Sequence, residues 1–127
     1  MHIAHIAIWV NNLEKMRSFY TTYFDAISNE KYVNPSKKFS SYFLSFGRSG
    51  CQLELMHRPD IAKAIEQVQL GLAHLAISVG SKAKVDQLTQ QLQNDGYQVI
   101  GAPRTTGDGY YESVVLDPEG NQVEITI

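Results

Sequence analysis

The stretch HIAIWVNNLEKMRSFYTTYF, residues 5–24, contains two different hydrophobic periodicities in succession. Its first part is rich in β-branched and apolar residues, which predicts a strand over residues 2–10. After a polar break, Leu13, Met16, Phe19, Tyr20, Tyr23 and Phe24 recur at helical spacing, which predicts an amphipathic helix over residues 13–24. Asn11, followed three residues later by Glu14, is the predicted capping box.

The second half of the chain repeats this pattern with HLAISVGSKAKVDQLT, residues 74–89. His5 and His74 are 69 residues apart, Glu54 and Glu124 are 70 apart, and the His-to-Glu separations within the halves are 49 and 50. Internal repetition of this length indicates a duplicated βαβββ module. We therefore predict one α+β domain over residues 1–127, built from modules 1–57 and 72–127 and joined by a linker over residues 58–71.

The remaining elements follow from local turn and periodicity signals. Residues 31–38 are predicted to form a polar loop, and residues 42–46 and 52–56 two strands around the turn Gly47-Arg48-Ser49-Gly50. The linker is predicted to hold a short helix. The second half is predicted to contain a strand over 73–79, a helix capped by Ser81 and stopped at Asp95-Gly96, a strand over 97–100, and a hairpin of strands 110–116 and 122–127 around Asp117-Pro118-Glu119-Gly120-Asn121.

Side-chain alternation places the histidines and glutamates on one face of their strands. The opposite faces carry only apolar residues and Cys51, and these are predicted to pack on the helices. His5, Glu54, His74 and Glu124 share the mixed faces, and two histidines with two glutamates make a nitrogen and oxygen donor set for a divalent metal. A single such residue is more often structural, but four at repeated spacing and common parity indicate a metal site.

Composition limits the classes of function. The net charge of −2 and the absence of a basic stripe argue against a nucleic-acid partner. Apolar runs are too short to span a bilayer and no signal-peptide pattern is present, so a cytoplasmic protein is expected. Cys51 is the only cysteine, which rules out an internal disulfide; its position predicts a small buried apolar residue.

The phrases HIAIWVNNLEKMRSFYTTYF, QLELM, GLAHLAISV and SVVLDPEGNQVEIT resemble the vicinal oxygen chelate superfamily over nearly the whole chain. This superfamily includes glyoxalase I, methylmalonyl-CoA epimerase, fosfomycin and bleomycin resistance proteins, and extradiol dioxygenases. The resemblance implies paired βαβββ modules with curved mixed sheets that form a metal-centred cleft. It also implies that the four ligand positions fall on His5, Glu54, His74 and Glu124, the residues that repeat and parity select.

The pattern of ligands is similar to that of bacterial glyoxalase I. The resemblance implies one divalent ion per site (Zn, Ni, Co, Mn or Fe), Glu124 or Glu54 as the group that moves a proton, and a metal-stabilised enediolate. Relatives of this type usually place an arginine for a glutathione carboxylate where this chain has Trp9. Trp9, Arg104, Tyr110 and Tyr111 are the expected substrate contacts, the last three from the loop region that begins at Arg104.

The expected function is therefore that of a glyoxalase I-like lyase or isomerase, similar to lactoylglutathione lyase. Its substrate would be a small molecule with adjacent oxygens, such as a thiol adduct of the hemithioacetal type. The alternatives are another metal-dependent reaction of the superfamily, such as epimerisation, and an antibiotic-modifying or antibiotic-binding resistance protein. Relatives that resemble this chain are often homodimers with metal sites at the subunit interface, so a homodimer is expected as well.

Overall fold

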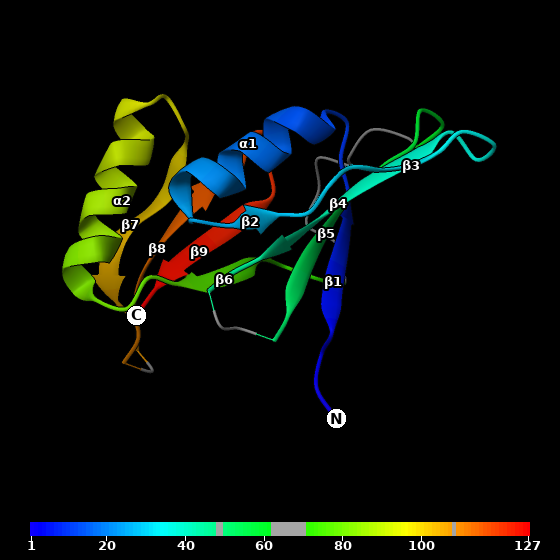
Figure 1. The fold of residues 1–127 in the computed structure, drawn as a ribbon. Helices are drawn as coiled ribbons and strands as arrows, with labels where there is room; N and C mark the ends of the chain where they lie inside the picture. Colours follow the sequence, from blue (N-terminus) through cyan, green and yellow to red (C-terminus); the bar gives the residue numbers. More distant parts are fainter. Residues whose placement is uncertain (48–49, 62–70, 108) are drawn as a thin grey trace. The chain divides into compact units, whose positions relative to one another are not determined.

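The computed structural model describes residues 1–47, 50–61, 71–107 and 109–127, which form two compact units, Met1–Glu66 and Gln67–Ile127. Each unit is a mixed sheet with one helix on one of its faces (Figure 1). This architecture confirms the predicted α+β class with curved mixed sheets. Neither helix in the described residues has the length and apolar character needed to cross a lipid bilayer.

The first unit runs β1 (His5–Trp9), α1 (Leu13–Tyr23), β2 (Ile27–Ser28), β3 (Tyr32–Asn34), β4 (Phe39–Ser45) and β5 (Gln52–His57). Its sheet has the order β1-β5-β4-β2, and β3 pairs with β4 outside this path. β1 and β5 are parallel, whereas the other pairs are antiparallel. The first strand of the unit therefore lies beside its last strand.

The second unit has the same topology. It runs β6 (Leu75–Ser78), α2 (Lys82–Asn94), β7 (Val99–Thr105), β8 (Tyr111–Leu116) and β9 (Gln122–Thr126), with the order β6-β9-β8-β7. Again the first and last strands, β6 and β9, are parallel and adjacent, and the others are antiparallel. The repeat seen in the sequence is thus also a repeat of strand pairing.

Each helix buries its apolar stripe against one face of its own sheet. α1 contributes Leu13, Met16, Phe19 and Tyr20, which pack with Leu44, Leu53 and Leu55 of the first sheet. α2 contributes Val85, Thr89 and Leu92, which pack with Val115, Val123 and Ile125 of the second sheet. The buried Thr89 hydroxyl pairs with that of Ser113 at 2.6 Å, so the polar atoms in this core are satisfied.

Several predicted boundaries and caps differ from the structure. Asn12, not Asn11, caps α1, and its side chain accepts a hydrogen bond from the Lys15 amide at 3.0 Å. The residue directly before the first helical position is the one whose side chain reaches the free amides of the first turn. Ser81 caps α2 as predicted, through the Lys84 amide.

The polar loop predicted over residues 31–38 contains the short strand β3, which forms a hairpin with β4. β4 begins three residues earlier than predicted, at Phe39. β7 extends to Thr105 with register irregularities and includes Pro103, which an edge strand tolerates because no partner needs its missing amide. Arg104 is therefore a strand residue and not part of the following loop.

Other predictions fall wholly or partly on residues outside those described. These are the turn at residues 47–50, the short helix in the linker over residues 58–71, and the Gly107-Asp108-Gly109 segment.

The turn before β9 is described in full: the Asp117 carboxylate accepts hydrogen bonds from the amides of Glu119 and Asn121, both at 2.9 Å, and Gly120 has a φ of 87°. The predicted turn chemistry is thus confirmed. Cys51 is half-buried, not fully buried as predicted.

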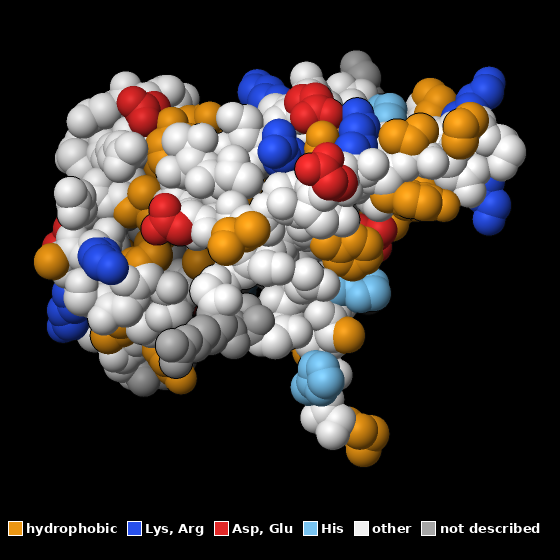
Figure 2. Space-filling model, in the orientation of Figure 1, with side chains coloured by type: hydrophobic (Ala, Val, Ile, Leu, Met, Phe, Trp, Pro, Cys, Tyr) orange, Lys and Arg blue, Asp and Glu red, His pale blue; other side chains and the backbone are white. Residues whose placement is uncertain are grey.

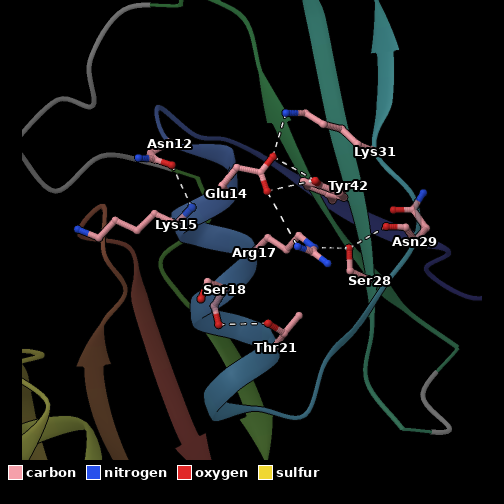
Figure 3. Close-up of polar contacts among 10 residues, drawn as sticks. All are labelled: Asn12, Glu14, Lys15, Arg17, Ser18, Thr21, Ser28, Asn29, Lys31 and Tyr42. Atoms are coloured by element: carbon pink, nitrogen blue, oxygen red, sulfur yellow. Dashed lines mark hydrogen bonds and ion pairs between the residues drawn. The ribbon is translucent and has the colours of Figure 1, made fainter.

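A polar network joins the start of α1 to the first sheet (Figure 3). The Glu14 carboxylate accepts hydrogen bonds from Lys31 Nζ at 2.9 Å and from the Tyr42 hydroxyl at 3.1 Å. Arg17 Nε donates to Ser28 Oγ at 3.1 Å one turn further along the helix. The hydrogen bond from Lys31 holds the pKa of Glu14 below its usual value, and burial raises the pKa of the Tyr42 hydroxyl.

We expect Glu14→Gln to lower the free energy of unfolding by about 0.5 kcal/mol at pH 7, a small value because the carboxylate is partly exposed. Since the folded-state pKa of Glu14 is lowered, its contribution is complete above about pH 5 and is lost as the pH falls through that pKa. Chemical denaturation of both proteins at several pH values measures this. Glu30→Gln, at an exposed carboxylate, is the control; equal stability of Glu14→Gln and wild type at pH 7 would contradict the prediction.

Candidate functional site

The first unit brings His5 and Glu54 together on the sheet face opposite α1. In the parallel register of β1 and β5, Ala7 stands opposite Glu54, and His5 lies two residues before Ala7 on the same face. His5 Nε2 and Glu54 Oε2 are 3.8 Å apart.

The second unit repeats this arrangement. Ala76 of β6 stands opposite Glu124 of β9, and His74 lies two residues before Ala76, just ahead of the strand. His74 Nε2 and Glu124 Oε2 are 3.4 Å apart. An alanine therefore faces the glutamate in both units, and the histidine occupies the same diagonal position.

The two pairs also share their degree of burial. The side chains of Glu54 and Glu124 are 13% and 18% exposed, and those of His5 and His74 are 46% and 45% exposed. Each carboxylate is thus largely withdrawn from water, while the imidazole beside it stays accessible. Withdrawing a carboxylate from water is costly unless a cation or a protonated partner compensates the charge.

The geometry of each pair fits a shared divalent ion. Two donor atoms that each lie about 2.1 Å from one ion are at most about 4.2 Å apart. Both measured separations are within this limit. One imidazole nitrogen and one carboxylate oxygen suit Zn, Ni, Co, Mn or Fe. A pair is only part of a ligand set, and across residues 1–47, 50–61, 71–107 and 109–127 no group of three or more candidate ligand side chains gathers at metal-binding distances.

The predicted substrate residues occupy different environments. Trp9 lies on the face of His5 and Glu54, two residues beyond Ala7. Arg104 pairs with Glu112, with Nη2 and Oε1 3.6 Å apart. Glu112 stands opposite Thr126, two residues beyond Glu124, so this ion pair is on the ligand-bearing face of the second sheet.

The two predicted tyrosines differ. Tyr111 lies on the helix-covered face, where its hydroxyl donates to Asp86 Oδ1 at 2.7 Å and Lys82 Nζ lies 4.9 Å from its ring centroid. The hydrogen bond to Asp86 raises the pKa of Tyr111. The structure therefore separates Tyr111 from the face that bears Glu124. Tyr110 is exposed and precedes β8, and its backbone amide donates to the Thr106 hydroxyl.

Residues that the sequence reasoning missed also lie on the ligand-bearing face of the first unit. Phe43 stands opposite Glu54, and its ring makes an edge contact with the His5 ring at a centroid distance of 5.3 Å. Phe39, on the same face of β4, contacts Trp9 in the same way at 6.2 Å. Parity along the predicted strand 42–46 could have identified Phe43, whereas Phe39 was missed because that strand was predicted to begin only at residue 42.

Comparison with known proteins identifies the family. The profile of the Glyoxalase/Bleomycin resistance protein/Dioxygenase superfamily matches residues 2–125. The chain is also 30% identical to the uncharacterized protein YqjT of Bacillus subtilis (strain 168) over 126 residues, covering 95% of this chain and 94% of that protein. This chain belongs to the Glyoxalase/Bleomycin resistance protein/Dioxygenase superfamily, as its sequence motifs predict.

Solved structures agree with the fold. Glyoxalase I from Zea mays matches with a TM-score of 0.81 at 23% identity, covering 98% of this chain and 43% of the maize chain. The present chain thus spans less than half the length of the maize chain. A glyoxylase/bleomycin resistance protein/dioxygenase domain from Frankia sp. EAN1pec matches with a TM-score of 0.84 at 17% identity, covering 100% of this chain and 97% of that one. At these identities the likeness establishes the fold.

We expect the double variant Glu54→Gln, Glu124→Gln to lose at least about tenfold in affinity for divalent metal, because an amide oxygen carries no charge to neutralise the ion. Metal content after dialysis, measured by elemental analysis, and titration with Zn²⁺ or Ni²⁺ report the change. Glu30→Gln is the control for loss of one carboxylate elsewhere. Unchanged metal content in the double variant would place the metal at other residues.

Proposed function

We propose that this protein is a metal-dependent, glyoxalase I-like isomerase, with an activity of the lactoylglutathione lyase type. Its substrate is a small molecule with adjacent oxygens, such as the hemithioacetal that an α-ketoaldehyde forms with a thiol. The observation that carries the proposal is the pair of largely buried glutamates, each beside an accessible histidine at the same register position of its unit.

Donor count supports a site made of both pairs. Catalytic zinc sites use three protein side-chain ligands, and one His–Glu pair supplies two. We propose that His5, Glu54, His74 and Glu124 hold one divalent ion together. The two carboxylates would balance the charge of the ion, the two imidazoles would complete four protein ligands, and the ion would supply Lewis-acid chemistry to the oxygens of a bound substrate.

The proposed reaction moves protons and needs no oxidant or reductant. A bound divalent ion supplies Lewis-acid stabilisation of negative charge on substrate oxygens. Glu124 or Glu54 accepts the proton from the carbon that bears the hydroxyl and sulfur and returns it to the neighbouring carbonyl carbon. The hydroxyl proton moves to the other oxygen, so the hemithioacetal becomes a hydroxy thioester with the same atoms. A carboxylate held next to the reacting carbon makes this transfer feasible.

The similarity to a solved glyoxalase I is consistent with this chemistry. Family membership does not by itself identify the reaction, because the superfamily name covers several functions. The paired carboxylates favour proton transfer over simple binding, since a resistance protein that only sequesters a drug has no need of two glutamates withdrawn from water. Epimerisation of a carbon acid would use the same groups and is the alternative that the assay must separate.

The activity is tested with hemithioacetals of methylglyoxal and a panel of thiols, each with Zn²⁺, Ni²⁺, Co²⁺, Mn²⁺ or Fe²⁺. We expect formation of the thioester, followed by its ultraviolet absorbance, and a fall in kcat of about 10²- to 10⁴-fold in Glu124→Gln or Glu54→Gln. Glu30→Gln should retain wild-type kcat. Absence of thioester with every thiol and metal, while the protein is metal-loaded, would refute the isomerase.

We further propose that the protein is a homodimer in which the first unit of one subunit and the second unit of the other supply the two His–Glu pairs. A two-fold axis would then generate two identical sites. The topology leaves edge strands in each sheet, and pairing between subunits is one way to cover such edges and the open sheet faces.

Mixing His5→Ala and His74→Ala chains tests the shared site. If each site uses both subunits, mixed dimers hold one intact and one doubly altered site, and about a quarter of the wild-type activity should return after random exchange. Metal titration of the mixture gives an independent reading. No recovery in a mixture shown to contain mixed dimers, or a monomer by light scattering, would exclude the arrangement.

A further inference from the structure

Three aromatic rings line the ligand-bearing face of the first unit beyond the His5–Glu54 pair. The Trp9 ring contacts Phe39 at a centroid distance of 6.2 Å, and Phe39 contacts Tyr32 at 6.1 Å. We call these residues (Trp9, Phe39 and Tyr32) the aromatic wall. Trp9 is 43% exposed and Tyr32 is 52% exposed, so the wall presents open ring surface. Figure 2 shows hydrophobic side chains gathered over β3 and the adjoining end of the sheet.

The aromatic wall is continuous with the candidate ligand pair. Trp9 follows His5 by four residues on β1, and Phe39 precedes Phe43 by four residues on β4, so each step spans about 13 Å along its strand. Phe43 contacts the His5 ring directly. A molecule of thiol-adduct size that reached the His5–Glu54 pair along this face would therefore lay its distal group on the wall.

The guanidinium that lies beside the wall is already paired with a carboxylate. The Arg58 guanidinium lies 5.7 Å from the Trp9 ring centroid and donates two hydrogen bonds to Asp60, from Nε at 2.8 Å and from Nη2 at 2.6 Å. This bidentate pair is the strong geometry for an arginine and a carboxylate. A substrate carboxylate would have to displace Asp60 to use Arg58, so this guanidinium favours an uncharged group beside Trp9.

We propose that the aromatic wall is a subsite for a neutral aromatic or apolar substituent, and that the thiol carrier of the substrate is of this class and lacks a carboxylate at its distal end. This inference rests on the proposed function for the reacting part of the molecule. The evidence for the subsite itself is separate from that function. It consists of the ring contacts and of the Arg58–Asp60 ion pair, which carries no net charge. Large rings bury much apolar area and contact other rings in edge or offset geometry, which gives both affinity and selectivity for an aryl group.

Trp9 is the only tryptophan of the chain, so its fluorescence reports on the wall without any catalysis. The probes are benzyl methyl sulfide and its 4-carboxy derivative, which differ by one carboxylate. We expect the neutral sulfide to change the Trp9 emission with a Kd at least about tenfold lower than that of the acid, because the charge would lose hydration without gaining a partner. The titration is run with and without Zn²⁺.

Variants separate the wall from general effects. Phe39→Leu and Tyr32→Ala should each weaken binding of the neutral sulfide about two- to tenfold, the range for loss of one aromatic contact. Val33→Ala is the matched control, because Val33 is the exposed neighbour of Tyr32 on β3 and points to the opposite face. Trp9→Arg, followed by calorimetry because it has no tryptophan, should reverse the preference in favour of the carboxylate.

The outcomes distinguish this inference from the proposed function. Equal Kd values for the two sulfides, or equal losses in Tyr32→Ala and Val33→Ala, would overturn the subsite even if the protein isomerises hemithioacetals. A clear preference for the neutral sulfide would support the subsite even if no thioester forms. A third outcome is that Trp9 emission changes when the protein alone is diluted but does not respond to either sulfide. This result would show that a second copy covers the wall, and it would overturn the inference.

Discussion

The parallel pairing of the first and last strands within each unit is the interaction on which the rest of the arrangement depends. β1 pairs with β5 and β6 with β9, so residues about fifty positions apart become neighbours. The register sets Ala7 opposite Glu54 and Ala76 opposite Glu124, which brings each histidine diagonally next to its glutamate. A shift of one residue in either pair would turn the glutamate toward the helix, because side chains alternate between the faces of a strand.

The helices determine which face is free. α1 and α2 each cover one side of a sheet and bury the alternating leucines, valines and isoleucines there. The other side is thereby left for mixed residues, and in the first unit these combine ionisable donors with aromatic rings. The Glu14 network holds the start of α1 on its sheet from the helix side and takes no part in the ligand-bearing face. Stability and candidate chemistry thus use opposite faces of the same strands.

The aromatic wall lies on the open face of the first sheet, which the helix does not cover, and it therefore points to a binding site. A contiguous patch of exposed rings is typical of a binding site, and these rings lie next to the His5–Glu54 pair along β1 and β4. The Arg58–Asp60 pair removes the charge that a guanidinium would otherwise present beside Trp9. Chemistry at one end of the face and selection of a neutral group at the other are compatible with one bound molecule.

The amino-acid sequence by itself determined the α+β class, the duplicated module, most of the elements, and the common parity of His5, Glu54, His74 and Glu124. It did so because hydrophobic periodicity and turn chemistry are local, and because the repeat makes a weak signal appear twice. Tertiary structure alone decided the strand order, the short strand β3, and the separation of Tyr111 from the ligand-bearing face. It also decided the contacts of Trp9 with Phe39 and Arg58. These depend on register and on which strands become neighbours, and pairing between distant segments leaves no mark in the local sequence.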